Sequence, residues 1–110
     1  MEATNVKLWI ILGEYADKLR KMASDTSDPN RAALLDLASQ LLGEMADSIL
    51  DYRIRRSQLE SLDRLIRLFK TFGLPSNMLT RIRRLVIRYV EVHDSHWPLV
   101  GANDMIGIPA

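Results

Sequence analysis

The sequence of 110 residues contains no cysteine, and its glycines and prolines together number only nine. Without cysteine the chain has no disulfide, no thiol nucleophile and no thiolate metal ligand, and a reducing, cytoplasmic setting is expected. Aromatic residues make up only 6% of the chain, whereas leucine, alanine, arginine, aspartate and isoleucine are abundant. This composition favours helices over strands.

The chain also lacks a long apolar segment. Its longest strongly apolar run extends from Leu8 to Leu12, whereas a membrane-spanning helix needs about 20 such residues. The run has no basic leader and no small-residue cleavage site, and Glu14 and Asp17 follow it, so no signal peptide is expected. The charged fraction of 26% and the chain length are typical of one globular domain with one core.

Motifs that would indicate catalysis are missing as well. There is no nucleophile elbow, no phosphate-binding glycine loop and no dinucleotide fingerprint. His93 and His96 are the only histidines, and neither belongs to a Glu-x-x-His or His-Glu-x-x-His pattern. We therefore expect no enzyme, no cofactor and no metal site, with His93 bordering the core and His96 in solvent.

Apolar residues recur at spacings of three and four in four segments, which predicts four amphipathic helices. The first is expected over about 4–23, and the second begins at Pro29 with Asp28 as its N-cap. The third ends at Gly73 and the fourth follows a Ser76 cap. The buried stripes are predicted, in chain order, to contain Leu8, Ile11, Leu12, Tyr15, Leu19 and Met22; Leu34, Leu37, Ala38, Leu41, Met45 and Ile49; Leu59, Leu62, Leu65, Ile66 and Phe69; Ile82, Leu85, Val86, Tyr89, Val90 and His93.

The boundary between the second and third helices is the least marked. No glycine or proline lies between Gly43 and Gly73, which would also allow a single helix of about 44 residues and about 66 Å. That length does not fit a compact domain of this size, so a polar turn is predicted between Asp47 and Ser57.

Short connections make successive amphipathic helices antiparallel neighbours. The predicted fold is therefore an all-α, antiparallel up-down-up-down four-helix bundle over residues 1–97. Residues 98–110 contain proline and glycine without helical period, and they are expected to form a short irregular C-terminal tail.

Charge is distributed unevenly although the net charge is only +1. Between Arg53 and Arg88 there are ten basic residues against two acidic ones, and nine of the ten are arginine, the residue suited to bidentate phosphate contacts. Many of them fall into two rows, one on each of the last two predicted helices. The rows are Arg56, Arg64, Arg67 and Lys70, and Arg81, Arg84 and Arg88.

Two interpretations of these rows are open. Arginine is a good helix former, and every amphipathic helix has a solvated face. Alternatively, the rows lie on adjoining ridges of neighbouring helices and bind the phosphates of a nucleic acid.

The run from Leu8 to Leu12 is apolar around most of a helix. No helix of a four-helix bundle is central, so part of this run, in particular Trp9 and Ile10, should lie outside the intramolecular core. Self-association through the first helix is therefore expected.

Four features stand out over about residues 6 to 97: the opening "LW", a proline-containing turn before the second helix, "LESLDRLIRLFKTFGLPS" and the closing Trp97. In these features and in the order of its helices the chain resembles a small four-helix-bundle family. This family contains the accessory variability-determinant proteins of diversity-generating retroelements and the ribosomal-RNA intervening-sequence proteins. The resemblance implies a ring-like homo-oligomer, such as a pentamer, with a basic surface, acting as an accessory to a reverse transcriptase and its template RNA.

Two functional hypotheses follow. The first is a non-enzymatic accessory protein, a homo-oligomer that binds nucleic acid, with RNA preferred, and docks on a larger enzyme such as a reverse transcriptase. The second is a structural or protein-interaction subunit of a multi-protein phage or defence complex, in which the arginines only confer solubility. Phosphate binding weakens steeply with salt, whereas apolar docking does not, and this difference separates the two.

Overall fold

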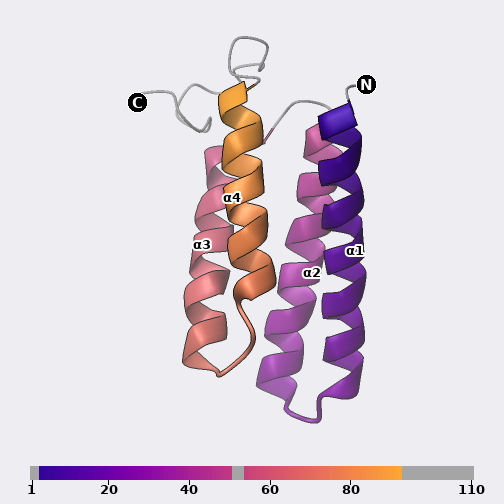
Figure 1. The fold of residues 1–110 in the computed structure, drawn as a ribbon. Helices are drawn as coiled ribbons and strands as arrows, with labels where there is room; N and C mark the ends of the chain where they lie inside the picture. Colours follow the sequence, from indigo (N-terminus) through magenta and orange to yellow (C-terminus); the bar gives the residue numbers. More distant parts are fainter. Residues whose placement is uncertain (1–2, 51–53, 93–110) are drawn as a thin grey trace.

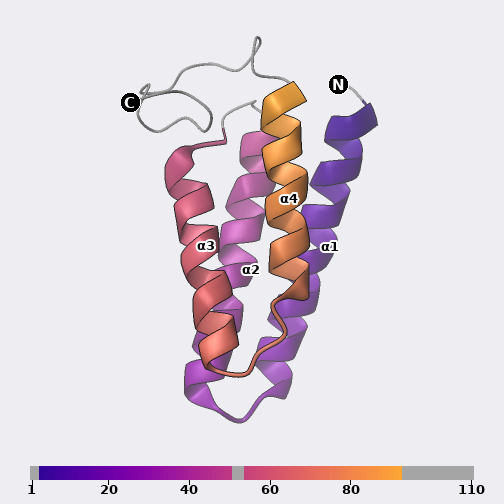
Figure 2. The ribbon, with the colours of Figure 1, turned by 60° about the vertical axis from the view of Figure 1, so that its left-hand side comes forward.

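The computed structural model describes residues 3–50 and 54–92, and every regular element in these ranges is an α-helix. The helices are α1 (Ala3–Asp25), α2 (Pro29–Leu50), α3 (Arg56–Thr71) and α4 (Asn77–Val92). Successive helices run in opposite directions along one common axis (Figure 1), and the turned view of Figure 2 shows the same arrangement. The predicted all-α four-helix bundle is confirmed. His93, His96, Trp97 and the predicted tail at 98–110 lie outside the described residues.

The start of α2 is fixed by the predicted cap. The Oδ1 atom of Asp28 accepts the backbone N–H of Asn30 at 2.9 Å, and the Asp28 carbonyl accepts the N–H of Ala32 at 2.9 Å. Pro29 is the first helical residue, where its missing N–H costs nothing. The α1–α2 connection therefore needs only three residues outside the helices, Thr26 to Asp28.

Helices α2 and α3 are separate, as the length argument predicted. α2 ends at Leu50 and α3 begins at Arg56. Gln58 joins the two helix ends, because its Oε1 accepts the backbone N–H of Arg55 at 2.8 Å while its Nε2 donates to Ser48 Oγ at 2.9 Å. One glutamine side chain thus caps α3 and ties it to the last turns of α2.

The α3–α4 turn is closed by Gly73, which has a φ of +70°. The N–H of Leu74 donates to the Phe69 carbonyl at 2.7 Å, and the N–H of Gly73 donates to the Lys70 carbonyl at 3.3 Å. These two bonds form a Schellman motif, which requires a left-handed residue at the position of Gly73.

We predict that alanine has opposite effects at two glycines. Gly73→Ala should lower the free energy of unfolding by about 1–2 kcal/mol, because a Cβ is strained at positive φ. Gly43→Ala should raise it by about 0.5–1 kcal/mol, because Gly43 is inside α2 and an added Cβ would have nothing within 4 Å. Urea denaturation of both variants checks this, and equal effects would contradict the assigned turn.

The core is built from apolar side chains of all four helices. The largest fully buried side chains are Phe69, Leu12, Leu19, Leu35, Leu42, Met45, Ile49, Ile54, Leu62, Leu79 and Ile82. The predicted stripe of α3 is entirely buried, and that of α4 is buried over its described part except for the half-buried Leu85. In α1, Leu8, Leu12 and Leu19 are buried, and Ile11, Tyr15 and Met22 are half-buried at the edge.

One predicted core residue is wrong. Leu37 is 53% exposed, whereas Leu35 and Leu42 are buried. The centre of the buried face of α2 therefore lies to one side of the predicted stripe, and Leu37 projects from the side of α2 that faces α3.

Helix α2 packs much more closely against α1 than against α3. The α1–α2 seam contains small buried residues, among them Ala16, Ser39 and Ala46, and Ser39 Oγ donates to the Ala16 carbonyl at 2.8 Å. Because small side chains let two helices approach closely, α2 is held against α1, and its far side stands away from α3 (Figure 1). In the part of the chain that the structure describes, every helix is too short or too polar to traverse a lipid bilayer.

Candidate nucleic-acid interface

The bundle has two halves of opposite charge. Residues 3–50, which form α1 and α2, carry five basic and seven acidic residues, a net charge of −2. Residues 54–92, which include α3 and α4, carry nine basic and three acidic residues, a net charge of +6. A polyanion is therefore attracted to the α3–α4 half rather than to the molecule as a whole.

On α3 the basic residues lie opposite the core. Arg64, Arg67 and Lys70 are exposed, while Leu62 and Phe69 on the other side of the helix are fully buried. Arg56, in the first turn, is half-buried and has an interaction of its own. Three of the four basic residues predicted on this helix are thus available to a partner from solvent.

On α4 the structure places the second row in the same way. Arg81, Arg84 and Arg88 are exposed, and Ile82 and Val86 on the opposite side are fully buried. Arg81 is already engaged, because its Nη1 donates to the Tyr15 hydroxyl of α1 at 3.0 Å. Arg84 and Arg88, one turn apart, project from the outer face of the helix.

A further arginine lies between the two rows. The Arg83 guanidinium on α4 forms an ion pair and a hydrogen bond with the Asp63 carboxylate on α3. This pair was not predicted from the sequence, although Asp63 is one of only two acidic residues between Arg53 and Arg88. It fixes α3 against α4 and neutralises one of the arginines at the seam.

The seven predicted residues do not form one compact patch. Arg81 reaches toward α1, whereas Arg64 lies on the opposite side of the α3–α4 half, where it faces α2. Arg67 and Lys70 follow Asp63 by four and seven residues, so they lie on the side of α3 near α4. This leaves the exposed residues Arg67 and Lys70 on α3 and Arg84 and Arg88 on α4, and we call these four residues the basic face.

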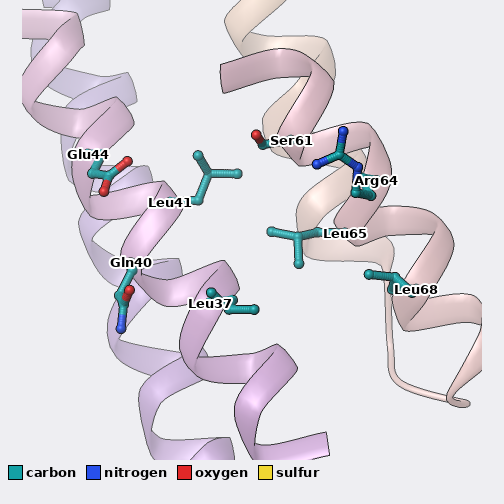
Figure 3. Close-up of a pocket in the computed structure, with 8 residues that line it drawn as sticks. All are labelled: Leu37, Gln40, Leu41, Glu44, Ser61, Arg64, Leu65 and Leu68. Carbon is teal, nitrogen blue, oxygen red and sulfur yellow. The ribbon is translucent and has the colours of Figure 1, made fainter. Parts of the chain in front are cut away.

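A groove of about 290 Å³ separates α2 from α3 (Figure 3). Leucines from both helices form its walls, and polar groups lie along its rim. The residues that line this α2–α3 groove are Leu37, Gln40, Leu41, Glu44, Ser61, Arg64, Leu65 and Leu68.

A second apolar surface lies on α1. Val6, Trp9 and Ile10 are exposed, with exposed fractions of 36%, 42% and 45%. We call these three residues the α1 ridge. The prediction that Trp9 and Ile10 lie outside the intramolecular core is confirmed, whereas Leu12 of the same run is fully buried. The oligomer that they were predicted to form stays a prediction.

No group of three or more histidine, cysteine, aspartate or glutamate side chains that would hold a metal ion occurs within residues 3–50 and 54–92. The described side chains offer exposed positive charge on α3 and α4 and exposed apolar groups on α1 and α2. Comparison of the chain with protein-family models, with curated proteins and with solved structures found no match.

Proposed function

We propose that the protein is a non-enzymatic accessory module, an oligomeric helical bundle that binds nucleic acid through its basic face and docks on a larger enzyme. RNA is the preferred nucleic acid, a reverse transcriptase or similar enzyme is the partner, and the cytoplasm is the site of action. The observation that carries the proposal is the net charge of +6 on the α3–α4 half, with Arg67, Lys70, Arg84 and Arg88 exposed on it.

The chemistry of these residues supports phosphate as the ligand. Three of the four are arginine, whose planar guanidinium matches a phosphate in a bidentate contact. All four side chains are solvent-exposed, so contact with a phosphate does not require the bundle to open. Because two of them lie on α3 and two on the neighbouring antiparallel helix α4, they suit a backbone with repeated charges better than a single anion.

The alternative is a structural subunit without direct nucleic-acid binding, and one observation favours it. Leu37 and the α1 ridge are large exposed apolar groups, and such surfaces are typical of protein contacts. Both features are compatible in one molecule, because the apolar surfaces and the basic face occupy different sides of the bundle.

The two proposals predict different responses to salt. For four phosphate contacts, the affinity for single-stranded or hairpin RNA should fall by about 50- to 150-fold between 50 and 200 mM monovalent salt. Fluorescence anisotropy with labelled RNA at several salt concentrations measures this slope. A parent protein that binds neither RNA at 50 mM salt, or whose affinity does not change with salt, would leave the structural subunit as the better description.

A further inference from the structure

The described part of the chain exposes large apolar side chains at two places that differ in shape. The α1 ridge is convex, because its three residues project from one helix within two turns. The α2–α3 groove is concave, and Leu37 projects at its edge with 53% of its surface exposed. We infer that the α1 ridge of one copy of this chain inserts into the α2–α3 groove of a second copy.

The groove has the composition of a helix-binding site. Leu41 and Leu65 are each only 8% exposed and form its floor, while Leu37 and the half-buried Leu68 form its edges. Its polar residues are at the rim, with Glu44 and Gln40 on α2 exposed to solvent (Figure 3). No buried charged group points into it, so it lacks the convergent polar contacts that fix a small ligand.

The dimensions of the two surfaces agree. The α1 ridge extends from residue 6 to residue 10, which is about 6 Å along a helix axis. On α2 the groove extends from Leu37 to Glu44, which is about 10 Å on the same measure. Trp9 and Ile10, side by side on the ridge, supply the large apolar anchors that such a groove needs.

Charge decides between this contact and a ridge-to-ridge contact. Inserting the ridge into the groove brings α1, which has a net charge of +1, against α2, which has a net charge of −2, and α3, which has a net charge of +2. The two walls of the groove together are therefore neutral, and its α2 wall is opposite in charge to α1. A ridge-to-ridge dimer would instead bring two α1 helices together, each with a net charge of +1. Opposite potentials favour encounter and like potentials oppose it, so the ridge-to-groove contact is preferred.

The contact has a definite symmetry. Ridge and groove are different surfaces, so the interface is heterologous, and each copy uses its ridge toward one neighbour and its groove toward another. Arg64 lies on the groove wall and becomes covered, whereas the basic face remains open. This inference rests on the self-association included in the proposed function, and it adds that α1 of one copy binds the α2–α3 groove of another.

The test uses two variants, each defective in one surface. The ridge variant carries Trp9→Glu and Ile10→Glu, and the groove variant carries Leu37→Glu. All three positions are at least 42% exposed, so circular dichroism should show both variants folded. Light scattering should give an oligomer for the parent and a monomer of about 12.6 kDa for each variant alone.

The informative sample is the equimolar mixture of the two variants. The ridge variant keeps an intact groove and the groove variant keeps an intact ridge, so the mixture should form a heterodimer with twice the mass of one chain. Lys21→Glu, at an exposed position farther along α1, serves as the control and should keep the parent's mass.

Three results would overturn the inference: a monomeric parent, a groove variant with the parent's mass, or a mixture that stays monomeric. The second would indicate a ridge-to-ridge contact, because the groove variant keeps an intact ridge. Failure here is distinguishable from failure of nucleic-acid binding, because both variants retain Arg67, Lys70, Arg84 and Arg88. Their affinity for RNA should still fall with salt even if no mixed dimer forms.

Discussion

Replacing Arg67, Arg84 and Arg88 together by glutamate is expected to lower the affinity for RNA by about 100-fold or more at 0.1 M salt. Each lost phosphate contact removes about 0.7 to 0.9 from the slope of log affinity against log salt. Three lost contacts should therefore flatten the slope by about 2 to 2.7. All three side chains are exposed, so stability should change by only about 0.5 kcal/mol or less for each substitution.

A matched control is available on the other half of the bundle. Lys18, Arg20 and Lys21 of α1 are also exposed, and their replacement by glutamate changes the net charge by the same amount. If the basic face binds RNA, the control should retain most of the affinity. If both triple variants lost the same RNA affinity, net charge alone would determine binding. If the variant of Arg67, Arg84 and Arg88 bound RNA as the parent does, these arginines would be only a solvated surface.

Truncation of Phe69 to alanine is expected to lower the free energy of unfolding by about 3–5 kcal/mol. Phe69 is fully buried, so its loss removes apolar contacts and leaves a cavity that the four helices fill only in part. Urea denaturation followed by circular dichroism measures the change.

Two other substitutions on α3 serve as comparisons for the loss of stability expected in Phe69→Ala. Phe69→Leu keeps most of the volume and should cost less than about 1.5 kcal/mol. Arg67→Ala, at an exposed position two residues earlier, should stay within about 0.5 kcal/mol. If Phe69→Ala cost as little as Arg67→Ala, the face of α3 that packs inward would be assigned wrongly.

Helix α3, and α4 over its described residues, could be predicted from sequence, because each has a narrow apolar face and a charged opposite face. Helix α2 was harder. Leucines at positions 34, 35, 37, 41 and 42 cover a wide arc of the helix, so periodicity alone does not identify the centre of the buried face. Which leucines are buried depends on how closely α1 and α3 approach, and small residues such as Ser39 and Ala46 decide that.

For the candidate site, the sequence predicted which basic side chains are exposed, but not how these side chains are arranged relative to one another. Spacing within a helix places Arg84 and Arg88 on one side. It does not reveal that Arg81 turns toward Tyr15, that Arg83 pairs with Asp63, or that Arg64 lies beside α2. These contacts depend on the rotation of neighbouring helices about their own axes, which is set by packing between residues far apart in the sequence.

The cap made by Gln58 has a consequence for motion. Gln58 bonds to Ser48, and close to this link the Tyr89 hydroxyl of α4 lies 3.4 Å from the Ile49 carbonyl. Both polar links join the α3–α4 hairpin to the same end of α2. The two hairpins are therefore expected to pivot about this end, on the microsecond-to-millisecond timescale of collective hinge motions. The motion also breaks the exposed hydrogen bond from Arg81 of α4 to Tyr15 of α1. Such a rotation changes the width of the space between α2 and α3 most at Leu37 and Leu68, which lie on the far side from the pivot.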